Sequence, residues 1–362
     1  MDNHNTENIE NYNLAVIVEP LLYWYDLNAR ILPWRENTEP YRVWVSEIML
    51  QQTRVEAVKP FYERFMEQLP TVQSLANTDE EILLKLWEGL GYYNRVRNLQ
   101  KSARIICKQY NGVFPQSYEQ ILALPGIGEY TAGAISSISF GKPVPAVDGN
   151  VLRVITRLSE NSQDITGTAL KRQITSQLQR VYPSLRCGDF TQSLMELGAT
   201  VCTPNGFPKC EICPLSHLCN ANNSGTQTQF PVKAKKSARK QQEMTVLLLC
   251  CDDKIAVNKR TGGGLLDGLW EFPNIPETLT VPQVKEWLSV HELVSTEIVK
   301  TPAQKHIFTH IEWKMSAYII QCENTNAEFV WVTRGMLERE ITLPTAFKKF
   351  VGCWTEPTQI SF

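Results

Sequence analysis

Four closely spaced cysteines place the strongest constraint on the fold of this chain. They fall within eighteen residues, in the pattern Cys202-x7-Cys210-x2-Cys213-x5-Cys219. Thiolates at this spacing can converge on one centre, where they bind zinc or an iron–sulfur cluster. The spacing alone leaves both kinds of metal centre open. We expect the loop to be a structural staple rather than an electron carrier, because no redox motif lies nearby.

The rest of the composition indicates an intracellular globular protein. No apolar run of the 362 residues approaches the roughly twenty that span a membrane. Residues 1–13 are polar and Asn-rich, without the apolar core of a signal peptide, and we expect them to form a disordered leader. Inside a cell, the ten cysteines favour metal binding over disulfides.

Any surface that binds nucleic acid must be local, because the net charge is only −2. Basic residues gather in two segments without any acidic residue, 89–110 and 224–242. Each segment could equally be an ordinary solvated face.

Residues 14–222 have the pattern of a mostly helical region. Thr78-Asp-Glu-Glu81 and Ser117-Tyr-Glu-Gln120 are typical capping boxes, and Pro40 favours a helix start before residues 41–52. Further helices are predicted at 169–181 and 189–201. Residues 223–242 read as an exposed basic linker.

Residues 243–362 predict a second domain of mixed α and β structure. Apolar and alternating runs predict strands at 245–251, 254–258 and 329–332, and within 306–322. Helical spacing predicts helices at 281–290 and 345–351.

A glycine corner followed by an aspartate is the second feature that points to chemistry. Gly126 and Gly128 interrupt two helix-like segments, and Asp148 follows about twenty residues later. The glycines permit a tight reversal that leaves backbone N–H groups at the next helix start free to bind a phosphate. The alternative is a helical hairpin in which the glycines only form the corner.

Taken together, these motifs resemble the endonuclease III superfamily of base-excision DNA glycosylases. The matching features are Leu124-Pro-Gly-Ile-Gly128, the aspartate of Val147-Asp-Gly-Asn150 and the four-cysteine loop, in that order. Within the superfamily, the chain is most similar to the MutY family, which removes adenine opposite 8-oxoguanine. Three long matches carry this similarity: Leu32-Pro-Trp-Arg35, Trp44-Val-Ser-Glu-Ile-Met-Leu-Gln-Gln-Thr53 and Trp87-Glu-Gly-Leu-Gly-Tyr-Tyr-Asn-Arg-Val-Arg97.

The resemblance implies a fold, a cofactor and a partner. The fold is an all-α helix-hairpin-helix glycosylase, a six-helix barrel plus an iron–sulfur cluster subdomain, followed by an α+β NUDIX-like domain. The cofactor is a [4Fe–4S] cluster held by the four cysteines, with no nucleotide cofactor. The partner is double-stranded DNA that carries an adenine:8-oxoguanine or adenine:guanine mispair. The protein is expected to be a monomer, cytoplasmic and nucleoid-associated, with no membrane partner.

Two carboxylates suit cleavage of an N-glycosidic bond. Glu47 is, apart from Glu56, the only acid in the apolar and glutamine-rich region 43–61. Burial would keep it protonated, as a general acid for adenine must be, although alone it could be a surface glutamate. Asp148 can stabilise the oxocarbenium-like sugar, or add to it, and can also cap the helix predicted at 149–158.

The resemblance adds Asn150 and Tyr130 to the catalytic centre, where Tyr130 is expected to position a water or to hydrogen-bond Asp148. Bifunctional relatives have a lysine at the position of Tyr130 and use it to form a Schiff base. A phenol cannot form an imine, so we expect a monofunctional glycosylase that leaves an abasic site.

A base buried in a duplex must be flipped out before it can be cut, which requires a pocket and a wedge. By resemblance, the adenine pocket is lined by Arg30, Trp34, Leu50 and Gln192, although Gln192 could instead support a helix cap at Asp189. By shape and resemblance, Gln52, Leu90 and Tyr92 form the wedge. Gly126 and Gly128 are expected to grip the DNA backbone.

The C-terminal region resembles the NUDIX-related reader of oxidised guanine through Gly264-Leu-Leu-Asp-Gly-Leu-Trp-Glu-Phe-Pro273. The acidic box of working NUDIX hydrolases is missing, which argues against pyrophosphate hydrolysis. The lesion contact is expected at Phe308, Thr309 and His310, where the family usually has Phe-Ser-His. The first cysteine gap is seven residues where the family usually has six.

Three other functions stay open from the sequence. The first is a related glycosylase for mismatched thymine or oxidised pyrimidines, since Tyr130 is compatible with the thymine enzymes. The second is a DNA-binding protein without catalysis, and the third is a nucleotide pyrophosphohydrolase.

Overall fold

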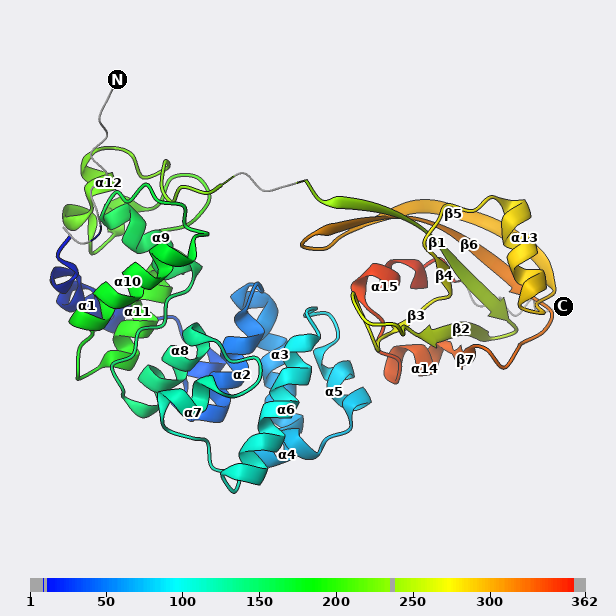
Figure 1. The fold of residues 1–362 in the computed structure, drawn as a ribbon, viewed down its shortest axis with the longest axis horizontal. Coiled ribbons are helices and arrows are strands. Elements are labelled where there is room, and N and C mark those ends of the chain that lie inside the picture. The colour runs from blue at the N-terminus through cyan, green and yellow to red at the C-terminus, as the bar shows by residue number, and fades with distance from the viewer. Residues whose placement is uncertain (1–8, 10–11, 235–237, 355–362) are drawn as a thin grey trace. The chain divides into compact units, whose positions relative to one another are not determined.

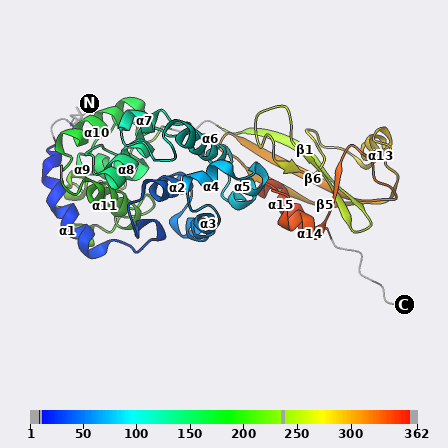
Figure 2. The ribbon, with the colours of Figure 1, turned by 90° about the horizontal axis from the view of Figure 1, so that it is seen from below.

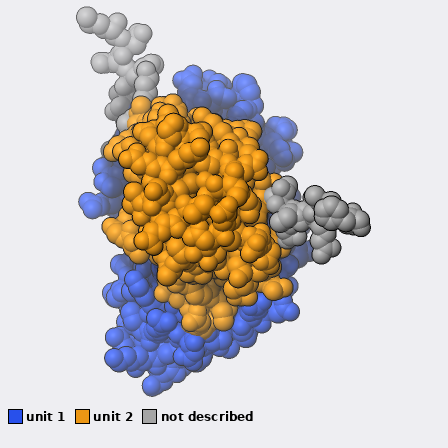
Figure 3. Space-filling view, turned by 90° about the vertical axis from the view of Figure 1, so that its right-hand side faces the viewer, with its two compact units in different colours: residues 1–77, 97–235 blue, residues 78–96, 236–362 orange. Residues whose placement is uncertain are grey.

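The structure is a computed structural model that describes residue 9 and residues 12–234 and 238–354. The chain divides into two compact units, which Figure 3 shows in two colours. Unit 1 comprises Met1–Asn77 and Arg97–Lys235, and unit 2 comprises Thr78–Val96 and Lys236–Phe362. Each unit is described by itself.

Unit 1 is helical, as expected. Its helices are α1 (Val18–Asn28), α2 (Pro40–Leu50), α3 (Val55–Gln68), α4 (Val72–Asn77), most of α6 (Asn94–Gln109), α7 (Tyr118–Leu122), α8 (Glu129–Phe140), α9 (Gly149–Leu158), α10 (Thr168–Val181), α11 (Cys187–Thr200) and α12 (Asn220–Asn223). Short 3-10 turns include η2 (Leu14–Ile17), η3 (Pro33–Arg35), η4 (Cys210–Ile212) and η5 (Ser216–Leu218). Helices α1, α9, α10 and α11 lie together in both ribbon views (Figures 1 and 2).

A single core joins α1, α9, α10 and α11. Among its fully buried side chains are Leu21, Ile155, Ile174 and Phe190, one from each helix. Helix α11 also packs on α8, which in turn packs on α2. This chain of contacts brings the end of α2, the starts of α8 and α9 and the second half of α11 around one cavity.

Some helix ends differ from the sequence prediction. Ser117 caps α7 and Asp148 caps α9, as expected. Helix α5 (Glu80–Trp87) is capped by Asp79 instead of Thr78, because the Asp79 carboxylate accepts the N–H of Glu81. Helix α11 begins at Cys187 rather than near Asp189, so Gln192 is not the partner of a cap at Asp189.

The expected N-terminal leader is only partly described. Residues 1–8 and 10–11 lie outside the described residues. Ile9 is fully buried in the core of unit 1, and Asn13 caps η2. The Tyr12 hydroxyl donates to the carbonyl of Leu218. The packed part of the chain therefore starts before residue 14, because Ile9 and Tyr12 supply apolar surface that the core buries.

Unit 2 is built on a mixed sheet. Its strands are β1 (Lys240–Cys251), β2 (Lys254–Lys259), β3 (Trp270–Glu271), β4 (Asn274–Ile275), β5 (Ser295–Ile307), β6 (Ile311–Cys322) and β7 (Val330–Thr333). The main strand order is β3-β2-β1-β6-β5, with β4 paired to β1 and β7 to β2. Strands β1 and β6 are parallel, and β5 and β6 form an antiparallel hairpin.

Side chains that alternate along β1 serve two different cores. Val246 and Leu248 join the side chains of α14 (Arg334–Arg339) and α15 (Thr345–Val351), whereas Leu247 and Leu249 join those of α13 (Val281–Val290). A strand that points successive residues to opposite faces can do this only when both faces are covered. The α+β fold expected for this region is therefore present. Strand β1 starts inside the segment expected to be linker, at Lys240.

Candidate active site in the helical unit

A cavity of about 550 Å³ lies within unit 1, lined from η3, α2, α8, α9 and α11. Its walls carry every catalytic and base-pocket residue predicted from the sequence, together with one wedge residue: Arg30, Trp34, Glu47, Leu50, Gln52, Tyr130, Asp148, Asn150 and Gln192. Segments more than 160 residues apart in sequence thus meet at one place. The cavity volume lies within the range of small-molecule and nucleobase sites.

Glu47 on α2 is buried. The Tyr130 hydroxyl donates a hydrogen bond to its Oε2 atom. Burial raises the pKa of Glu47 to about 7; the Asp148 charge adds to this rise, while the Tyr130 bond and the Arg35 charge oppose it. At neutral pH the carboxyl group can therefore carry a proton, as a general acid requires.

Tyr130 lies near the start of α8, and its ring packs beside α11. Burial and the neighbouring carboxylates of Glu47 and Asp148 hold the pKa of its hydroxyl well above the usual range. Its hydroxyl contacts Glu47 and, at 3.8 Å, the sulfur of Met195. From the sequence, Tyr130 is expected to position a water or to hydrogen-bond Asp148. The hydroxyl instead bonds Glu47, because α8 packs directly on α2.

Asp148 caps α9 and faces the cavity. One carboxylate oxygen accepts the N–H of Val151 at 2.8 Å, and the other accepts Nδ2 of Asn150 at 2.7 Å. Burial raises the pKa of Asp148. The two hydrogen bonds and the charge of Arg153 lower it, but burial has the larger effect. The residue that caps α9 therefore also lines the cavity. Asn150 in turn accepts Nη2 of Arg153 at 2.9 Å, and so orients the Asp148 carboxylate.

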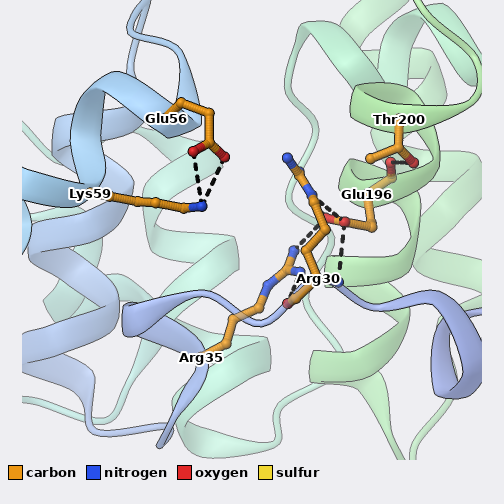
Figure 4. Close-up of polar contacts among 6 residues, drawn as sticks. All are labelled: Arg30, Arg35, Glu56, Lys59, Glu196 and Thr200. Carbon is orange, nitrogen blue, oxygen red and sulfur yellow. Dashed lines mark hydrogen bonds and ion pairs between the residues drawn. The ribbon is translucent and has the colours of Figure 1, made fainter.

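Two arginines and a glutamate form another part of the cavity wall (Figure 4). Arg30 and Arg35 both bond the carboxylate of Glu196 on α11. Arg30 is a pocket residue predicted from the sequence, whereas Arg35 and Glu196 are not among the predicted site residues. The available signal was an acid one helical turn after Gln192, on the same face of the helix.

The glycine corner has one constrained glycine and one open one. Gly126 has a φ of +78°, and a Cβ there would lie 2.7 Å from Cβ of Asn98. Gly128 has extended backbone, caps α8 and has open space where a Cβ would sit. The backbone N–H groups at the start of α8 are therefore accessible to a ligand.

The residues predicted to form a wedge differ in exposure. Gln52 and Tyr92 are exposed and occupy the left-handed region, with φ of 60° and 50°. Non-glycine residues in this region carry strain, which often marks functional positions. Leu90 is buried, with 7% of its surface exposed, so the structure does not present it as a wedge.

The expected lesion contact forms the turn between β5 and β6 in unit 2. The Phe308 ring packs on Trp313, with ring centroids 4.7 Å apart, whereas Thr309 and His310 are exposed. The Thr309 hydroxyl lies 3.3 Å from the Tyr92 hydroxyl, within the same unit.

The four predicted ligands, Cys202, Cys210, Cys213 and Cys219, all line one small cavity of unit 1. Nη1 of Arg157 lies 3.3 Å from the Cys202 sulfur. Among residues 9, 12–234 and 238–354, no three Cys, His, Asp or Glu side chains form a group that could hold a metal ion as they stand. The donor set itself, four thiols facing one space with an N–H···S donor beside it, fits a sulfur-ligated centre.

The described part of the chain contains no helix that is long and apolar enough to cross a membrane.

Comparison with known proteins connects the cavity to a family. Residues 45–180 match the model of the "HhH-GPD superfamily base excision DNA repair protein", and residues 244–352 match that of the NUDIX domain. An adenine DNA glycosylase of Rattus norvegicus is 34% identical over 93% of this chain and 77% of its own length. That of Buchnera aphidicola (Schizaphis graminum) is 32% identical over 82% of this chain and 85% of its own length.

The human adenine DNA glycosylase is also 34% identical, and this chain spans 66% of its length. Among solved structures, a thermostable thymine-DNA glycosylase matches with a TM-score of 0.53 and 31% identity, over 60% of this chain and all of that one. An endonuclease III–DNA complex, 23% identical with a TM-score of 0.51 over 61% of this chain and 99% of that one, shows the same fold. The chain therefore belongs to the adenine DNA glycosylase family of base-excision repair enzymes, with a helix-hairpin-helix glycosylase fold followed by a NUDIX-like domain.

Proposed function

We propose that this chain is a monofunctional glycosylase that removes adenine from adenine:8-oxoguanine and adenine:guanine mispairs in double-stranded DNA. The single observation that carries the proposal is the buried pair of Glu47 and Tyr130 beside Asp148, inside a cavity large enough for a flipped purine.

Glu47 supplies the proton. Because Tyr130 donates to Oε2, the acidic proton of Glu47 resides on Oε1, from which it passes to a ring nitrogen of adenine. Protonation makes the base a better leaving group, and the C1′–N9 bond breaks with its electron pair leaving on adenine. With a pKa near 7, Glu47 has both a large protonated fraction and a useful acidity at neutral pH.

Asp148 meets the cation that is left behind. Its carboxylate, oriented by Asn150 and by the start of α9, stabilises the oxocarbenium-like sugar or adds to C1′. Water then adds at C1′, and an abasic site remains. No lysine occupies the position of Tyr130, so the strand is not cut through a Schiff base.

The remaining parts hold the DNA. The start of α8 at Gly128 offers backbone donors to a phosphate, and Gln52 fills the space of the flipped base. The β5–β6 turn at Phe308–His310 reads the oxidised guanine, where the Thr309 hydroxyl keeps the hydrogen-bonding capacity of a serine. The four cysteines hold a [4Fe–4S] cluster that fixes the loop after α11.

A second candidate is the related thymine glycosylase, because a solved thymine-DNA glycosylase shares 31% identity with the helical region. Two findings favour adenine over thymine as the excised base. The chain has a NUDIX-like unit, and the adenine DNA glycosylases match it over most of its length.

The test is base release from a panel of duplexes with adenine:8-oxoguanine, adenine:guanine and thymine:guanine mispairs. We expect an alkali-labile site at adenine in the first two and none in the third. Borohydride should trap little covalent adduct. A duplex with adenine:8-oxoguanine that stays intact after alkali would refute the proposal.

A further inference from the structure

Glu196 is a buried acid that the reaction described above does not use. It lies on α11 with 1% of its side chain exposed, and it lines the active-site cavity. A buried carboxylate must be matched by donors and positive charge. Glu196 is matched by two arginines from the segment before α2, about 160 residues away in sequence.

The contacts to Glu196 hold both guanidinium groups. Arg30 donates to the carboxylate through Nε, Nη2 (3.0 Å) and its backbone N–H (3.4 Å). Arg35 donates through Nη2 at 2.8 Å, and its Nη1 donates to the carbonyl of Arg30 at 3.2 Å. Figure 4 shows the two guanidinium groups on either side of the Glu196 carboxylate. Two donors in a fixed fork restrict an arginine far more than one contact does.

The two arginines differ in what they leave free. Arg35 is 15% exposed and stands over the ring of Tyr25 at 5.7 Å, so its guanidinium is enclosed. Arg30 is 34% exposed, and within the described residues its Nη1 atom has no hydrogen-bond partner. That atom can donate to an acceptor of a purine that enters the cavity.

Glu196 is ion-paired with Arg35, and so belongs to the charged cluster that faces Glu47. Two guanidinium groups and one carboxylate sum to +1; without the carboxylate the sum would be +2. Arg35 is close enough to act on the ionisation of Glu47. The other groups that face Glu47 are Tyr130 from α8 and Asp148 from the start of α9. Lys171 of α10 also lines the cavity, and an ion pair of Glu56 and Lys59 on α3 lies near Arg30.

We propose that Glu196 is a positioning residue: it fixes Arg35 and holds Arg30 for the base, and its negative charge lets Glu47 keep its proton at neutral pH. This inference rests on the proposed function for the role of Glu47. It does not make Glu196 an acid or a base in the reaction, because its carboxylate is fully occupied by arginine donors.

The charge role predicts a shift of the pH profile in the Glu196→Gln variant, which keeps the shape and loses the charge. We expect the basic limb of the single-turnover rate of adenine release to move down by about one pH unit, hence about tenfold slower release at pH 8 and a smaller effect at pH 6. Glu196→Asp keeps the charge. Its rate should fall at the same basic pH as that of the parent protein, even if its maximal rate is lower. Asp189→Asn, which removes an exposed acid from the same helix, is the matched control and should leave the limb unchanged.

A stability cycle separates this inference from the proposed function, because it needs no base release. The Tm gain from Glu47→Gln should grow from pH 5 to pH 8 as Glu47 ionises in the parent protein. In the Glu196→Gln background we expect that growth to fall to about half or less, since Glu47 then ionises at lower pH. Two results would overturn the inference. One is an equal increase in the Tm gain between pH 5 and pH 8 in both backgrounds, and the other is a basic side of the pH–rate profile that does not shift in Glu196→Gln. A parent protein that shows the cycle but releases no adenine would refute the proposed function alone.

Discussion

The α2 wall and the α11 wall of the cavity each carry a buried carboxylate, and the two are in opposite states. Glu47 on α2 meets a neutral hydroxyl and another acid, and burial raises its pKa to about 7. For Glu196 on α11, burial also raises the pKa, but the hydrogen bonds and charges of Arg30 and Arg35 outweigh it and leave the pKa lower than usual. The same residue type at similar depth is thus an acid on one wall and a permanent anion on the other, and the partner decides which.

The largest expected effect comes from removing the acid of the α2 wall. Glu47→Gln should lower the single-turnover rate of adenine release by about 10²–10⁴-fold, because a carboxamide cannot donate the proton. Glu56→Gln, the same substitution at an exposed acid on the next helix, should leave the rate within about twofold of the parent rate. A Glu47→Gln enzyme with a nearly normal rate would remove Glu47 from the mechanism.

The same variant should be more stable than the parent at alkaline pH. The folded-state pKa of Glu47 is raised, so its favourable contribution is present at low pH and is lost as the pH rises towards 7. Above pH 7 we expect Glu47→Gln to gain up to about 3 kcal/mol in unfolding free energy, and nothing below pH 4.5. Urea unfolding at pH 5 and pH 8.5 measures the difference. A variant that is less stable at both values would contradict the buried-acid assignment.

On the α11 wall, the arginine pair should matter for stability. Arg35→Met leaves the Glu196 carboxylate with one arginine, which should cost about 2–4 kcal/mol in unfolding free energy. Arg186→Met breaks an exposed pair with Asp26 and should cost less than about 1 kcal/mol. Equal costs in the two variants would mean that the Glu196 cluster is not held as the structure shows it.

The smallest expected effect lies outside both walls, in the turn of unit 2. If Thr309 reads the lesion, Thr309→Ala should reduce the preference for adenine:8-oxoguanine over adenine:guanine by about fivefold to tenfold, the worth of one hydrogen bond. The rate on adenine:guanine should stay within twofold. Competition between the two duplexes measures this preference, and an unchanged ratio would remove Thr309 from recognition.

The sequence could predict the parts of the site that depend on local patterns. Asp148 was predicted as a carboxylate for the sugar that could also cap the helix at 149–158, and it does cap α9. Gly126 was recognised because a positive φ favours glycine. Where two neighbouring residues could both cap, as Thr78 and Asp79 can, the choice depended on backbone geometry that the pattern does not contain.

The contacts between distant segments could not be predicted. The hydroxyl of Tyr130 reaches Glu47 across 83 residues, and Arg35 reaches Glu196 across 161. Such partners depend on how α8 and α11 pack, which is a property of the assembled core. This is why the Tyr130 hydroxyl bonds Glu47 rather than Asp148, one of its two expected roles, and why Glu196 was not predicted although Gln192 on the same helix was.

The most direct test of this account is the pH dependence of single-turnover adenine release from a duplex with adenine opposite 8-oxoguanine. With Glu47 as the acid, the rate should fall as the pH rises through about 7, approaching tenfold per unit on the basic side. A rate that stays constant or rises between pH 6 and pH 9 would contradict a protonated Glu47 as the general acid.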